Sequence, residues 1–175
     1  MTGKYLLLAI LTVAQIANAQ LPVPEFRNEP MAIKNDSMLQ RLEFTHYETT
    51  EHVNTDGLTY VSTSNLDYVV YDTPKSPARL NTSTEFMVKL TDAEIDPETI
   101  FLLTKVECYK KKRVVYTTGN IGYYNASLKV KIEFKKIAPG IYKITPEKLL
   151  PKSEYAFVII PDNGAKTRCF LFGIN

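Results

Sequence analysis

Several residue types on which catalysis and cofactor binding depend are scarce in this chain of 175 residues, which has two cysteines, two histidines and seven glycines. The cysteines, Cys108 and Cys169, lie far apart in the chain. The histidines, His46 and His52, share one polar segment, so neither a zinc site nor a base beside a nucleophile is predicted. No Gly-x-Ser-x-Gly elbow and no glycine-rich phosphate loop occurs. We therefore expect no metal, no cofactor and no catalytic residue.

Long hydrophobic runs are absent as well, because no segment reaches the eighteen or so apolar residues that a membrane-spanning helix needs. The short apolar run at residues 5–11 follows Lys4 and precedes the small residues of 17–19. Those are the three regions of a secretory signal peptide. We expect cleavage after Ala19 and an exported protein, periplasmic or secreted, that is soluble after cleavage and not membrane-spanning.

The two halves of the chain differ sharply in charge. Residues 20–100 contain six Lys and Arg against fourteen Asp and Glu, whereas residues 101–175 contain fourteen against five. Such a split can mark a surface for anionic partners, such as acidic glycans. Alternatively, the halves fold against each other and their charges mix at the surface, which is the commoner arrangement. An exported protein seldom meets nucleic acid, so we expect no nucleic-acid partner.

The segment after the cleavage site begins with a stiff leader, because residues 20–24 contain two prolines. Two half-apolar runs, residues 30–34 and 38–43, flank the turn residues 35–37 and predict a β-hairpin. Residues 45–59 are polar and have no apolar period, so they predict a long loop.

Strand patterns with turn residues between them then recur every eight to fourteen residues. They occupy residues 60–63, 68–71, 84–90, 100–106, 113–117, 128–135, 141–144, 154–160 and 167–174. No segment keeps a helical apolar period, so an all-β sandwich is predicted. The predicted organisation is a signal peptide at residues 1–19, the leader, hairpin and polar loop at 20–65, and the sandwich at 66–175.

The clearest alternation covers residues 128–135. Period two predicts a buried face and an exposed face for this segment. The buried face comprises Leu128, Val130, Ile132 and Phe134, and the exposed face comprises Lys129, Lys131, Glu133 and Lys135.

One local pattern resembles the tyrosine corner of immunoglobulin-like and fibronectin-type sandwiches. Leu150 and Pro151 precede Tyr155, which begins an apolar strand, and residues 96–100 resemble the D-P-x-T-I start of a strand in bacterial immunoglobulin-like domains. The resemblance implies an immunoglobulin-like antiparallel β-sandwich with an N-terminal β-hairpin extension, in which the Tyr155 hydroxyl bonds to upstream backbone.

A second resemblance covers more of the chain. Residues 24–31, 139–144, 154–157 and 172–174 are similar to a group of exported proteins of Gram-negative bacteria with this sandwich. That group carries no activity that could be transferred, so the resemblance implies no functional residue.

Export would place Cys108 and Cys169 in an oxidising compartment. A disulfide between them would close a loop of about sixty residues and stabilise the fold by about 4 kcal/mol in the chain-entropy model. Two buried free thiols are the alternative.

The densest basic run is Lys110, Lys111, Lys112 and Arg113, with a tyrosine on either side. A basic and aromatic cluster of this kind can bind an anionic ligand, for which an envelope polymer is the sharpest candidate. The alternative is a solvated hairpin tip, in which lysines discourage pairing between sheet edges.

The favoured function is an exported non-enzymatic β-sandwich module with a binding or envelope-structural role, whose partner would be an envelope protein or an anionic glycan. A small secreted hydrolase or hydrolase inhibitor is the alternative. It would need a cleft of converging polar groups.

Overall fold

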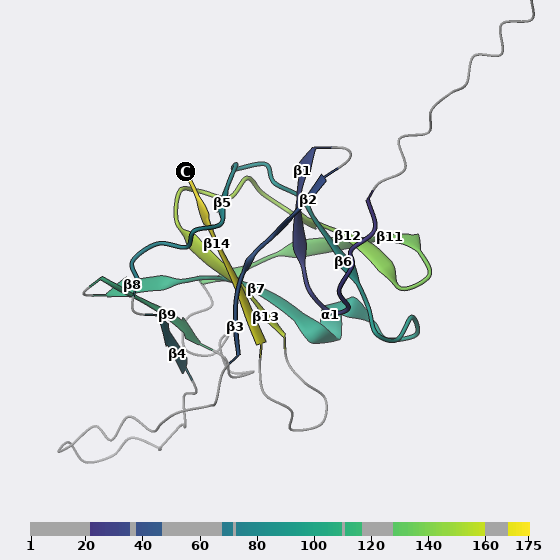
Figure 1. Ribbon diagram of the computed structural model, residues 1–175, viewed down its shortest axis with the longest axis horizontal. Helices are drawn as coiled ribbons and strands as arrows, with labels where there is room; N and C mark the ends of the chain where they lie inside the picture. The colour runs from purple at the N-terminus through teal and green to yellow at the C-terminus, as the bar shows by residue number, and fades with distance from the viewer. Residues whose placement is uncertain are drawn as a thin grey trace, which may run out of the picture.

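The structure of the chain is a computed structural model that describes residues 22–35, 38–46, 68–71, 73–109, 111–116, 128–159 and 168–175. These residues form mostly antiparallel strands and one short helix, so the all-β prediction is confirmed (Figure 1). The predicted signal peptide and its cleavage site at Ala19 lie outside the described residues. Within these ranges no helix has the length and apolar character needed to cross a membrane.

The elements follow one another along the chain in a fixed order. They are β1 (Met31–Asn35), β2 (Met38–Arg41), β3 (Glu43–His46), β4 (Tyr68–Tyr71), β5 (Arg79–Leu80), β6 (Phe86–Lys89), α1 (Pro97–Ile100), β7 (Phe101–Lys105), β8 (Glu107–Tyr109), β9 (Lys112–Tyr116), β10 (Lys129–Val130), β11 (Ile132–Ala138), β12 (Ile141–Pro146), β13 (Glu154–Ile159) and β14 (Arg168–Ile174). Among the described residues they form three sheets. The five-stranded sheet has the order β11-β12-β6-β1-β2, the six-stranded sheet β10-β7-β13-β14-β3 with β5 beside β14, and the three-stranded sheet β4-β9-β8.

The six-stranded sheet lies between the other two, and strand β13 shows how. Tyr155 and Phe157 face the main apolar core, where Phe157 meets Phe86 of the five-stranded sheet in an edge-on contact with ring centroids 4.9 Å apart. Ala156 and Val158 face the opposite way, into a second cluster shared with the three-stranded sheet. Because both faces of β13 are covered, all six of its residues are buried.

The alternating segment at 128–135 is divided between two sheets. β10 pairs with β7 in the six-stranded sheet, and β11 pairs with β12 in the five-stranded sheet, with Lys131 between them. The four residues predicted to face outward are exposed, and Leu128 is buried. The other three predicted core residues are only half-buried and pack against the core, because β10 and β11 are edge strands that solvent reaches: Val130, Ile132 and Phe134.

The hairpin predicted as an extension is continuous with the sandwich. β1 pairs with β6, so the hairpin extends the five-stranded sheet, and β3 pairs with β14 in the six-stranded sheet. The strand β3 reaches His46, whereas the sequence predicts loop from residue 45. Phe44 packs this strand against the core, because its ring stacks on that of Phe170 with centroids 4.8 Å apart.

The D-P-x-T-I segment forms one helical turn before strand β7 begins. The Asp96 carboxylate accepts a hydrogen bond from the backbone N–H of Glu98 at 3.0 Å, and Pro97 occupies the first turn. Both residues are typical of a helix start. The Asp96 side chain accepts a hydrogen bond from a backbone N–H that has no partner within the helix, and Pro97 has no backbone N–H that would need one.

Tyr155 has the geometry predicted for the corner. Its side chain is 2% exposed, and its hydroxyl donates a hydrogen bond to the backbone carbonyl of Pro151 at 2.8 Å. Leu150 is buried beside it, and the Tyr155 ring stacks on Phe172 with centroids 5.5 Å apart. Burial raises the pKa of the Tyr155 phenol, because the charged phenolate is poorly solvated there. The bond therefore ties the connection from β12 to the start of β13.

Replacing Tyr155 by Phe should lower the free energy of unfolding by about 0.5–1.5 kcal/mol, the net value of one intramolecular hydrogen bond. Tyr142→Phe is the matched control, because the Tyr142 hydroxyl makes no hydrogen bond with the described residues, and its free energy of unfolding should be unchanged. Urea denaturation measures both. Equal effects of the two substitutions would show that the corner bond contributes nothing specific.

Candidate functional site

Arg113 is fully buried, with 0% of its surface exposed. The sequence-based prediction that Arg113 belongs to an exposed basic patch is therefore wrong. The reason is the register of β9. Arg113 and Val115 lie two residues apart and share the strand face that packs on the six-stranded sheet, where Val115 belongs to the second apolar cluster. The basic run therefore ends one residue before Arg113, and this arginine points inward.

The Arg113 guanidinium is held by a carboxylate and a threonine. Its two terminal nitrogens donate to the two oxygens of Glu43 at 2.7 and 2.8 Å, a two-pronged pairing that only arginine provides. Its Nε donates to the backbone carbonyl of Thr73 at 2.9 Å, and Nη2 also donates to the Thr73 hydroxyl at 2.8 Å. These bonds join β9 to β3 and to the segment before β5.

A second carboxylate, Glu154, extends the network from β13. One of its oxygens accepts a hydrogen bond from the backbone N–H of Ser76 at 2.8 Å and lies 3.9 Å from Arg113 Nη1. The other pairs with Nη1 of Arg79. Glu43, Arg113, Glu154 and Arg79 thus form a chain of alternating charges, which we name the buried ion network.

Gly173 makes room for the network. It lies opposite Glu154 in the pairing of β13 with β14, and a Cβ atom at this position would overlap the guanidinium of Arg79. Nε of Arg79 donates to the Asn175 side chain and Nη2 to the carbonyl of Ile174, each at 2.9 Å. Arg79 is therefore held in one orientation.

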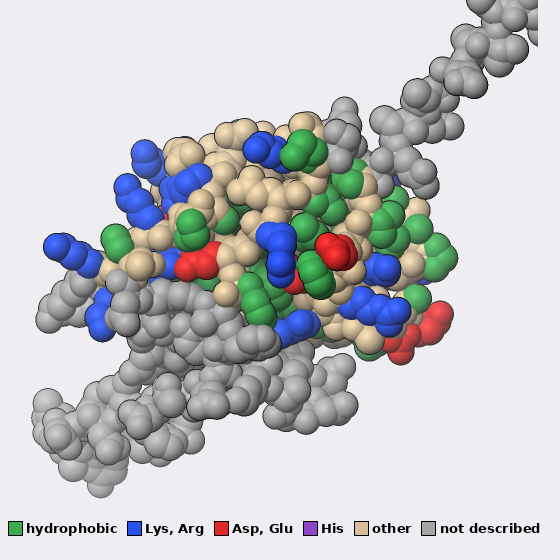
Figure 2. Space-filling view, viewed as in Figure 1, with side chains coloured by type: hydrophobic (Ala, Val, Ile, Leu, Met, Phe, Trp, Pro, Cys, Tyr) green, Lys and Arg blue, Asp and Glu red, His purple; other side chains and the backbone are tan. Residues whose placement is uncertain are grey.

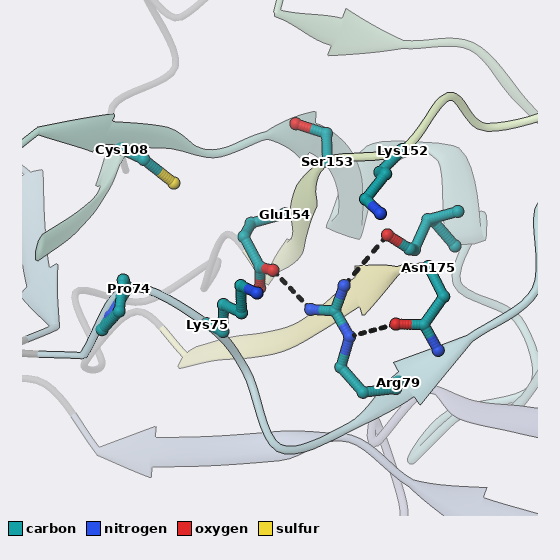
Figure 3. Close-up of a pocket in the computed structure, with 9 residues that line it drawn as sticks. Pro74, Lys75, Arg79, Cys108, Lys152, Ser153, Glu154 and Asn175 are labelled. Atoms are coloured by element: carbon teal, nitrogen blue, oxygen red, sulfur yellow. Dashed lines mark hydrogen bonds and ion pairs between the residues drawn. The ribbon is translucent and has the colours of Figure 1, made fainter. Parts of the chain in front are cut away.

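A pocket of about 480 Å³ opens over this end of the network (Figure 3). Its lining comes from β5 and the segment before it, from β8, from the tyrosine corner and from the end of the chain at β14: Pro74, Lys75, Arg79, Cys108, Lys152, Ser153, Glu154, Ile174 and Asn175. Three of these side chains are cationic and one is anionic. Since Arg79 already pairs with Glu154, the positive charges of Lys75 and Lys152 remain at the rim.

Cys108 borders the pocket and lies opposite Arg113 in the pairing of β8 with β9. Desolvation raises the pKa of its thiol, as does the Glu154 carboxylate, while Arg113 and Lys105 act in the opposite sense. Cys169 is fully buried in the second apolar cluster, where burial raises its pKa to about 12. Both are free cysteines, so the disulfide considered from the sequence is not formed.

Of the other residues of the predicted basic patch, Lys111 lies in the turn between β8 and β9, and Lys112 begins β9. Lys111 and Lys112 are exposed, and Lys110 lies outside the described residues. Figure 2 shows Lys and Arg side chains gathered at the end of the molecule where β8 and the end of β14 lie. The structure therefore adds Lys75, Lys152 and the pocket to this surface, although these lysines are distant in sequence from the basic run.

Of the two histidines, His46 is described, and it is not among the lining residues of this pocket. His46 lies on β3, opposite Arg168 of β14, and His52 lies outside the described residues. The part of the chain that the structure describes contains no group of three or more side chains suited to a metal ion.

Neither a protein-family model nor a curated protein nor a solved structure matches this chain. What the chain does must therefore be inferred from the buried ion network and the pocket beside it.

Arg113→Ala should lower the free energy of unfolding by about 3–5 kcal/mol, because it leaves Glu43 and Glu154 without their shared cation. Arg113→Lys keeps the charge but lacks the planar fork, so it should still cost more than about 1.5 kcal/mol. The adjacent exposed residue gives the control: Lys112→Ala should cost less than about 1 kcal/mol. Urea denaturation measures all three. Full recovery of stability by lysine would contradict the geometry described.

Proposed function

We propose that this chain is an exported, non-enzymatic module with an immunoglobulin-like β-sandwich, and that its basic end binds an anionic polymer of the cell envelope. The signal-peptide pattern at residues 1–19 supports export. The facing sheets and the tyrosine corner support the immunoglobulin-like assignment.

The observation that carries the binding proposal is the unbalanced positive charge around the pocket. Glu154 is the one carboxylate side chain among the described lining residues, and it pairs with Arg79, while Glu43 pairs with Arg113. Lys75 and Lys152 are exposed and make no ion pair with the described residues. A surface with one sign of charge attracts counter-charged partners and raises their association rate.

Four exposed acidic residues of the described chain lie close together in the sequence, outside the lining of the pocket. Asp92, Glu94 and Asp96 are exposed in the connector that leads into α1, and Glu98 is exposed in α1 itself. Figure 2 shows Asp and Glu side chains at the end of the molecule away from β8, and further acidic side chains at its centre and beside the Lys and Arg side chains near β8. Positive side chains are exposed elsewhere on the molecule as well, for example Lys135 and Lys136 of β11, so the basic end is a local concentration of positive charge and not one of two opposite poles.

A repeating polyanion is the partner that fits this surface best. The lysines belong to two separate parts of it, the β8–β9 turn and the rim of the pocket, and exposed ammonium groups on flexible stems suit spaced negative charges. An acidic glycan of the envelope has such charges and is available to an exported protein.

Binding to an acidic polysaccharide that carries one carboxylate per sugar should be measurable by titration at low salt and should weaken steeply at high salt, because exposed charges are screened over about 10 Å at 0.1 M. A variant with Lys111→Ser and Lys112→Ser should bind about threefold or more weakly at low salt.

The control variant carries Lys135→Ser and Lys136→Ser. These residues are exposed on β11, which lies at the other end of the molecule from β8 in Figure 1. This control variant loses as much positive charge as the Lys111→Ser, Lys112→Ser variant, and it should bind the polysaccharide as tightly as the unmodified chain does. Salt-insensitive binding, no binding, or equal losses in the two variants would refute the proposal.

A further inference from the structure

We propose that the pocket between Lys75 and Lys152, named here the lysine pocket, binds a compact dianionic group carried on a short aliphatic body. This inference rests on the proposed function, since the pocket belongs to the same basic end, and it specifies the chemical group that one point of that surface recognises. Phosphate monoesters and dicarboxylates share this chemistry.

The floor of the lysine pocket is rigid and electrically balanced. Arg79 is tied to Glu154, to the carbonyl of Ile174 and to the side chain of Asn175, so all three of its nitrogens have partners. Its charge is matched by Glu154, which also accepts a bond from the Ser76 backbone. The floor therefore gives the pocket its shape and leaves the recognition of charge to the rim.

The rim supplies two positive charges, those of Lys75 and Lys152, which no carboxylate of the described residues pairs with. Figure 3 shows Lys75, Lys152 and the sulfur of Cys108 around one pocket, and neither lysine forms an ion pair with the described residues. Two ammonium groups around one space are best neutralised by two negative charges on one small group. A volume of about 480 Å³ lies within the range of small-molecule sites.

The side chains of the pocket walls indicate which kind of ligand body should carry the dianionic group. Pro74 and Cys108 contribute apolar atoms, and no aromatic residue is among the described lining residues. Bases and sugars commonly stack on aromatic rings, which this lining does not offer. A short aliphatic chain fits the walls without such a platform.

Cys108 makes the proposal measurable, because its thiol borders the pocket while Cys169 is fully buried. In methanethiosulfonate labelling, the cysteine thiolate attacks the alkylthio sulfur of the reagent; a mixed disulfide forms, the S–S bond of the reagent breaks, and methanesulfinate leaves. The rate for a negatively charged reagent, divided by the rate for a positively charged one, reports the local potential at Cys108. In the Lys75→Ser, Lys152→Ser variant this ratio should fall about tenfold. Cys108→Ala should abolish labelling, which confirms the site.

Two dianionic probes, glycerol 3-phosphate and succinate, test for binding itself. At least one should slow labelling of Cys108 by about fivefold or more in a saturable way, and the one that protects identifies the phosphate monoester or the dicarboxylate as the preferred group. Acetate, a monoanion, should protect much less. The Lys75→Ser, Lys152→Ser variant should lose protection, and the Lys135→Ser, Lys136→Ser control should keep it.

The proposal that the lysine pocket binds a dianionic group would be overturned if neither dianion protected Cys108, or if protection were equal in the Lys75→Ser, Lys152→Ser variant. Polysaccharide binding that depends on Lys111 and Lys112 would survive that outcome, so the two proposals fail separately. Equal protection by acetate would also overturn the inference, because the pocket would then recognise a single charge.

Discussion

The pairing of the buried Arg113 guanidinium with Glu43 is the interaction on which this end of the structure depends. A buried charge is tolerated only when its hydrogen bonds are satisfied, and Arg113 meets this condition with Glu43, Thr73 and Glu154. These partners come from β3, from β13 and from the segment before β5. Because Arg113 belongs to the three-stranded sheet and both carboxylates belong to the six-stranded sheet, the same interactions hold the two sheets together. The apolar cluster around Val115 and Leu171 completes that contact.

The same network determines the surface above it. Glu154 is committed to Arg79 and Arg113, and Glu43 is committed to Arg113, so neither carboxylate is free to neutralise the lysines at the rim. The positive surface is therefore a consequence of how the fold is held together. Gly173 is part of this arrangement, because only a residue without a side chain leaves space for the Arg79 guanidinium between β14 and Glu154.

Much of the strand pattern could be predicted from period-two alternation, and the tyrosine corner from the position of Tyr155. The break between β10 and β11 could not, because the alternation continues through Lys131 while the chain passes from one sheet to the other. The burial of Arg113 could not be predicted, because the three lysines before it make the run look like an exposed basic segment. The one signal in the sequence is its spacing from Val115, which places both on one strand face. The rim lysines could not be predicted, since only the tertiary fold brings Lys75 and Lys152 together.

A double-mutant cycle between Arg113 and Glu43, followed by urea denaturation, tests most directly whether this pair holds the sheets together. Arg113→Met and Glu43→Gln should each destabilise the fold, because each leaves a charged partner unpaired. Together they should cost at least about 2 kcal/mol less than the sum of the single effects, since the second substitution removes the charge that the first left unpaired. Effects that add within about 0.5 kcal/mol would contradict the account, because they would mean that the two groups do not interact in the folded protein.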